Sequence, residues 1–106
     1  MIPFYILVDG IPKAVENWEE FNSFCTDPQD LRRVCLTCIG DVTISTVFLT
    51  VAIGWDDKLF FETMIFGGKY DLWRENYQTW EEAEDGHVKA VRLVRMFDKK
   101  QQWPLE

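Results

Sequence analysis

The sequence contains little positive charge. Eleven Lys and Arg residues stand against eighteen Asp and Glu residues, which gives a formal net charge of −7. Proteins that bind nucleic acid need clustered Lys and Arg to neutralise phosphates, so this composition argues against direct nucleic-acid contact. Acidity favours solubility, and it also suits a protein that occupies a basic site on a partner.

Membrane and secretion signals are also absent. No segment reaches the roughly 18 apolar residues of a membrane span, and the longest candidate, residues 42–54, is interrupted by four hydroxyl side chains. The opening Met-Ile-Pro-Phe-Tyr lacks the basic segment and cleavage site of a signal peptide. Three cysteines, an odd number, argue against a secreted disulfide framework. We therefore expect a cytoplasmic protein.

Catalytic and cofactor motifs are missing as well. The chain has no Gly-x-Ser-x-Gly elbow, and it has neither a phosphate-binding loop nor a dinucleotide-binding glycine pattern. We therefore expect no catalytic residues and no cofactor, and the sequence favours a binding protein over an enzyme.

Two long apolar runs predict the centre of a β-sheet. Residues 42–53 are rich in β-branched side chains and apolar on both faces in their second half, which is typical of a central strand. Residues 59–66 form a second run that ends at Gly67-Gly68. The short polar connection between the runs predicts neighbouring antiparallel strands.

The flanking segments predict the remaining elements. Asp9-Gly10 predicts a hairpin between residues 4–8 and 11–16, and Asn17 predicts the cap of a short helix that ends before Pro28. Residues 34–39 read as a strand, and residues 69–78 as a loop or short helical turn. Thr79 and Glu82 form a capping box for the last helix, while residues 99–106 read as a loose tail. The order ββαβββα predicts one α+β domain over residues 1–106, with an antiparallel sheet of about five strands packed against the C-terminal helix.

Two residues of the predicted domain are candidates for a binding or catalytic role. His87, the only histidine, lies on the apolar stripe of the last helix, and the neighbouring Gly86 indicates that another group packs closely there. Glu62 interrupts an apolar strand, where an unpaired charge is costly. Each residue has a structural interpretation, as a hydrogen-bonded core group, and a functional one, as a binding or proton-transfer group.

Exposed rings and acids form a second group of candidate binding residues. Aromatic side chains in connections often anchor interfaces, and the binding residues predicted here are Trp55, Asp56, Asp57 and Trp73, together with Glu62 and His87. A zinc site could be counted from three cysteines and the histidine. However, Cys35 and Cys38 are three residues apart on a strand and point to opposite faces, so no metal site is expected.

Several segments together carry a resemblance to a known family. They are Tyr5-Ile6-Leu7, the Trp18 helix, Ile39-Gly40-Asp41, and residues 45–49 (STVFL), 59–68 (LFFETMIFGG) and 79–87 (TWEEAEDGH). In these segments the chain resembles a family of short bacteriophage and prophage proteins. The resemblance implies a phage protein in the cytoplasm of a bacterial host. The family usually continues its first long strand with Gly, an acid and His, whereas Thr50-Val51-Ala52-Ile53 stands here, so no His-dependent activity is expected at that place.

These observations lead to one main hypothesis and three alternatives. The main hypothesis is a non-enzymatic phage accessory protein that binds a host or phage protein, such as an anti-CRISPR-like inhibitor of host defence. The first alternative is a sponge for a small ligand or signalling nucleotide, bound between the last helix and the sheet near His87, Glu62 and Trp80. The second is a small enzyme that uses Glu62 and His87 as a proton-transfer pair. The third is a structural or homodimerisation role.

Overall fold

A computed structural model describes residues 4–54 and 58–102, with side chains described as far as residue 96. The α+β class, the antiparallel strands and the C-terminal helix that the sequence predicts are confirmed. The elements in chain order are β1 (Phe4–Val8), β2 (Ile11–Val15), α1 (Trp18–Cys25), β3 (Arg33–Ile39), β4 (Val42–Ile53), β5 (Leu59–Phe66), β6 (Arg74–Tyr77) and α2 (Trp80–Gln102).

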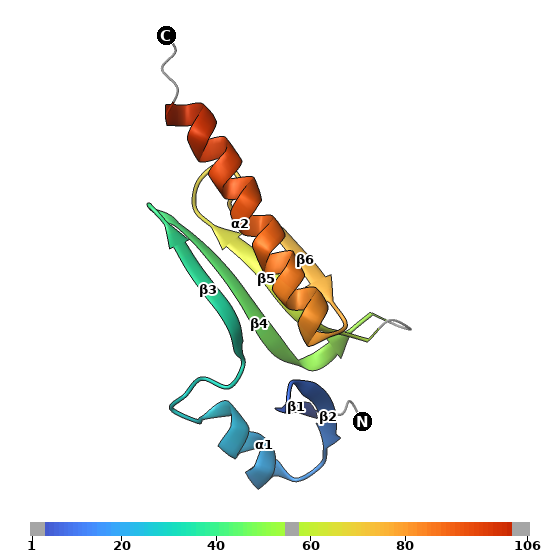
Figure 1. Ribbon diagram of the computed structural model, residues 1–106. Helices are drawn as coiled ribbons and strands as arrows, with labels where there is room; N and C mark the ends of the chain where they lie inside the picture. The colour runs from blue at the N-terminus through green and yellow to red at the C-terminus, as the bar shows by residue number, and fades with distance from the viewer. Residues whose placement is uncertain (1–3, 55–57, 103–106) are drawn as a thin grey trace.

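The strands form two sheets, a β1–β2 hairpin and a four-stranded sheet in the order β3-β4-β5-β6. The long strand β4 is central, as its two apolar faces predict, and it pairs antiparallel with β5 through Thr46 opposite Thr63 and Phe48 opposite Phe61. The pairing shifts register between Phe48 and Ile53, where Thr50 has a φ of 66°. The strand β4 therefore bends in its second half (Figure 1), and it also contacts β1 of the hairpin.

The helix α2 covers one face of the four-stranded sheet (Figure 1). Its capping box is confirmed, because Thr79 Oγ1 accepts from the Glu82 amide at 3.1 Å and Glu82 Oε1 accepts from the Thr79 amide at 3.2 Å. Its apolar stripe packs on the sheet in two clusters. One joins Ile44, Ile65, Ala90 and Val94, and the other joins Phe48, Phe61, Tyr77 and Ala83 to the N-terminal elements.

The hairpin and α1 pack together at one end of the molecule (Figure 1). The α1 cap is confirmed, since Asn17 Oδ1 accepts from the Glu20 amide at 3.1 Å. Phe24 of α1 is buried and meets the edge of Phe48, with ring centroids 5.9 Å apart. This contact joins α1 to the central strand β4.

Three details differ from the sequence-based expectation. The hairpin forms a sheet of its own, so six strands are divided between two sheets. Residues 74–77 form the edge strand β6 instead of a loop, because pairing with β5 outweighs the weak strand propensity of Arg-Glu-Asn-Tyr. The helix α2 continues to Gln102, so residues 99–102 are helical instead of part of a loose tail; Lys and Gln are good helix formers.

Within the described residues, no helix is both long enough and apolar enough to cross a membrane.

Candidate functional site

His87 lies between α2 and the sheet and is only 3% exposed. Both ring nitrogens have partners there. Nδ1 lies 2.7 Å from Thr46 Oγ1 of β4, and Nε2 lies 2.8 Å from Thr37 Oγ1 of β3. The inward orientation that the apolar stripe predicts is therefore confirmed, and the imidazole is a hydrogen-bonded core group.

The two threonines belong to a chain of polar groups that crosses the sheet. Thr46 Oγ1 lies 2.5 Å from Thr63 Oγ1, and the Thr63 hydroxyl bonds the phenol of Tyr77. Tyr77 donates to Glu75 Oε1 at 3.2 Å, and the other Glu75 oxygen pairs with Lys89 at 3.4 Å. This polar chain separates the two apolar clusters beneath α2.

The direction of each hydrogen bond follows from the acceptor at the end of the polar chain. Tyr77 donates to Glu75 Oε1, because a carboxylate oxygen can only accept, and the phenol oxygen accepts from Thr63. Thr63 then accepts from Thr46, and Thr46 accepts from Nδ1–H of His87. The neutral imidazole therefore carries its proton on Nδ1, and its Nε2 accepts from Thr37.

Burial controls the protonation of the two titratable groups inside the polar chain. Desolvation lowers the pKa of His87 below its ordinary value, because the imidazolium would lose its hydration. Desolvation also raises the pKa of Tyr77 to about 12, against an opposing effect of the Thr63 hydroxyl. Both groups are neutral at pH 7. A neutral imidazole with both nitrogens engaged and no exposed edge is not available to a substrate.

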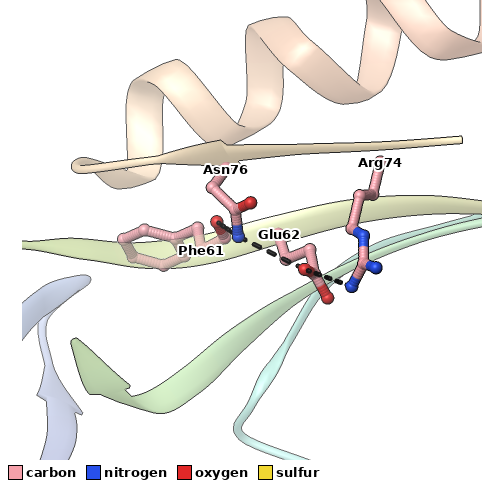
Figure 2. Close-up of polar contacts among 4 residues, drawn as sticks. All are labelled: Phe61, Glu62, Arg74 and Asn76. Carbon is pink, nitrogen blue, oxygen red and sulfur yellow. Dashed lines mark hydrogen bonds and ion pairs between the residues drawn. The ribbon is translucent and has the colours of Figure 1, made fainter. Parts of the chain in front are cut away.

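Glu62 lies on the opposite face of the sheet from His87. Its strand neighbour Thr63 points toward α2, and alternation turns Glu62 away from the helix. Figure 2 shows its carboxylate between Asn76 and Arg74 of β6. Asn76 Nδ2 donates to Glu62 Oε2 at 3.3 Å, and Arg74 Nη1 lies 3.9 Å from the same oxygen. The structure therefore does not bring Glu62 and His87 together as a proton-transfer pair.

The pocket expected near His87, Glu62 and Trp80 is not assembled either. His87 fills the space under α2, Glu62 faces away from the helix, and Trp80 lies at the helix start, where its ring meets the edge of Phe61 at 6.2 Å between centroids. The sheet lies between Glu62 and His87, and Trp80 lies seven residues before His87 on the same helix, against Phe61.

The other predicted binding residues lie in different parts of the chain. Trp55, Asp56 and Asp57 lie outside the described residues. Trp73 is half-buried, and it packs against the apolar cluster of Ile44 and Ile65, so it is not a free interface ring.

The cysteines do not converge. Cys35 pairs with Thr46 on the helix side of the sheet, Cys38 pairs with Thr43 on the other side, and Cys25 lies in α1. Over residues 4–54 and 58–102, no three His, Cys, Asp or Glu side chains form a group that could hold a metal ion.

The structure reveals one candidate surface that the sequence reasoning missed. Residues 4–31 contain six acidic residues and one basic residue, Lys13, and residues 80–88 contain four acidic residues with no Lys or Arg. The fold brings these segments together, since the β1–β2 turn packs against Trp80 of α2. We call residues 4–31 and 80–88 the acidic end.

Apolar side chains are exposed at the same acidic end. Trp18 is 65% exposed and Ile11 is 67% exposed, and Leu31 is partly exposed as well. A sequence signal for this surface existed in the two helix starts, Asn-Trp-Glu-Glu at residue 17 and Thr-Trp-Glu-Glu at residue 79. Their convergence depends on long-range packing and could not be predicted from the pattern.

Comparison of the chain with protein-family models, with curated proteins and with solved structures finds no match.

Proposed function

We propose that this protein acts without catalysis, as a phage accessory protein that binds a basic surface of another protein. The observation that carries the proposal is the acidic end, where unequal charge and exposed apolar side chains occur on one surface. Acidic side chains steer a basic partner toward this surface. Exposed rings such as Trp18 supply the apolar contact that stabilises an interface once it forms.

The buried polar chain supports the non-catalytic part of the proposal. The imidazole of His87 is engaged at both nitrogens, and the Glu62 carboxylate is partnered by Arg74 and Asn76 on the other face of the sheet. General acid–base chemistry needs a proton-transfer group within hydrogen-bond reach of a substrate. In this fold the imidazole of His87 instead forms hydrogen bonds to Thr37 and Thr46 in the core.

The biological setting of the proposal comes from the resemblance to phage and prophage proteins. A phage protein with an acidic binding surface suits an inhibitor that occupies the basic nucleic-acid groove of a host defence protein, as anti-CRISPR proteins do. The net charge of −7 supports that class of target, because a nucleic-acid groove is lined by Lys and Arg.

Affinity capture from a lysate of phage-infected bacteria tests the proposal. The tagged protein should retain a host or phage protein at stoichiometric yield. The double variant E84K/D85K reverses two exposed charges of the acidic end and should reduce the yield at least about tenfold, since rim charges mainly change association and its salt dependence.

The matched control is R92E/R95E, which reverses two exposed charges on the same helix outside the acidic end. It should retain the partner, and circular dichroism should show both variants folded. Absence of any stoichiometric partner, or equal loss in both variants, would contradict the proposed function.

A further inference from the structure

A cleft opens within the acidic end, between the β1–β2 turn, α1 and the first turn of α2. Its volume is about 420 Å³. The walls are apolar and come from Leu7, Phe24, Leu31 and Trp80, while the carboxylates of Asp9 and Glu81 stand at its border. The volume suits one or two side chains, and the walls suit the aliphatic part of a side chain.

The negative charge of this cleft determines whether it favours a cationic or an anionic group. Asp9 and Glu81 are both exposed, and neither forms an ion pair within the part of the chain that the structure describes. Capping side chains already engage three backbone amides at the start of α2, because Glu82 Oε1 accepts from the Gln78 and Thr79 amides and Thr79 Oγ1 accepts from the Glu82 amide. An anionic group would meet the two carboxylates of Asp9 and Glu81 here, so the cleft favours a cation.

The indole at the cleft wall is held in position. The Trp80 ring lies close to Gly10, where an added Cβ would meet ring atoms at 3.9 Å, and it forms an edge-to-face pair with Phe61. A fixed aromatic wall beside two carboxylates suits a guanidinium or ammonium group on an aliphatic stem, which gains apolar, charge and cation–π contacts together.

We propose that this cleft receives an Arg or Lys side chain, flanked by an aliphatic residue, from the basic surface of the protein partner. The inference rests on the proposed function and names the place and the chemistry of the contact. The stem of the basic side chain lies between Leu31 and Trp80, and its charged end meets Asp9 and Glu81. An adjacent aliphatic side chain of the partner packs toward Leu7 and Phe24.

Two capped tripeptides test this site without the natural partner. The probe is acetyl-Leu-Arg-Leu-amide, and its control is acetyl-Leu-citrulline-Leu-amide, in which a neutral side chain of the same shape replaces arginine. In a ¹H–¹⁵N NMR titration at low salt, the arginine peptide should give saturable shifts at the Trp80 indole and at the Gly10 and Glu81 amides. The citrulline peptide should bind at least about tenfold more weakly.

Two double variants complete the test. D9N/E81Q removes both cleft charges, and Asn tolerates the positive φ of residue 9; it should weaken the arginine peptide about tenfold. D41N/D71N removes two exposed charges outside the acidic end, and Asn at residue 71 keeps the oxygen that accepts from the Gly67 amide; this variant should bind as the wild type does. Equal binding of the two peptides, shifts confined to another surface, or no saturation at about 10 mM would overturn the inference.

The capture experiment separates this inference from the proposed function. If a stoichiometric partner is captured equally well by the wild type and by D9N/E81Q, the cleft inference fails and the proposed function stands. If the titration succeeds and no partner is captured, the proposed function fails and the cation site stands.

Discussion

Tyr77 fills the space that a side chain at Gly86 would occupy. A Cβ built at residue 86 would collide with the ring and hydroxyl of Tyr77, which crosses from the edge strand β6 to the helix. This contact explains a glycine in the interior of α2, where glycine ordinarily costs about 1 kcal/mol relative to alanine. It also places the phenol within reach of Thr63 and Glu75, at the end of the polar chain.

Replacing Gly86 should therefore reverse the usual effect of such a change. G86A gains helix propensity but must displace the Tyr77 ring, so we expect the free energy of unfolding to fall by about 1–3 kcal/mol. Urea denaturation followed by circular dichroism measures the difference. In a Y77A background the same substitution should be neutral or stabilising, and a stabilising effect in the wild type would contradict the contact.

Removing the imidazole should destabilise the fold by leaving buried hydroxyls without partners. H87L is expected to lower the free energy of unfolding by about 2–4 kcal/mol, because Thr46 and Thr37 both lose a hydrogen bond. H87Q, whose amide can donate and accept, should recover part of the loss. Similar stabilities of H87L and the wild type would show that the polar chain contributes nothing.

The lowered pKa of His87 predicts a dependence of stability on pH. Below about pH 6.5 the histidine of the unfolded chain becomes protonated, whereas the buried imidazole of the folded chain stays neutral to lower pH. The free energy of unfolding therefore falls as the pH decreases through that range. One proton limits the slope to about 1.4 kcal/mol per pH unit. Unfolding free energies measured from pH 7.5 to 5 should decline more steeply for the wild type than for H87Q, and parallel profiles would contradict the prediction.

Tyr77 predicts a second dependence at alkaline pH, with the opposite sign. Its pKa is raised to about 12 in the folded protein, whereas an unfolded tyrosine ionises near pH 10. The folded chain therefore holds a proton that the unfolded chain releases, and stability falls as pH rises from about 10 to 12. Ultraviolet titration should show one of the three tyrosines ionising late, and Y77F should abolish that transition.

Glu62 should contribute little to stability. Its pair with Arg74 is 3.9 Å long, and the Arg74 side chain is 65% exposed, so solvent screens most of the attraction. E62Q keeps an oxygen for Asn76 and should change the free energy of unfolding by less than about 0.5 kcal/mol. A loss above 2 kcal/mol would indicate a buried charge network that the contacts in Figure 2 do not contain.

Local patterns predicted those elements whose stabilising contacts are local. The capping box at Thr79 and the cap at Asn17 form hydrogen bonds within one turn. Both helix starts can therefore be predicted from the side chains at those positions. The β-branched side chains of residues 42–53, with both faces apolar in the second half, likewise predicted the central strand. By contrast, β6 has no apolar pattern of its own and exists only because β5 offers it backbone partners.

For the candidate site, the residue pattern was enough to place His87 on the inward stripe of α2 and to indicate that a group packs closely at Gly86. It also supplied the acidic composition on which the proposed function depends. Three relationships became visible in the folded chain alone: Glu62 and His87 lie on opposite faces of the sheet, Tyr77 is the group that packs against Gly86, and the β1–β2 turn meets the start of α2. Helix caps and side-chain periodicity involve residues only a few positions apart, whereas these relationships depend on how strands and helices from distant segments pack together.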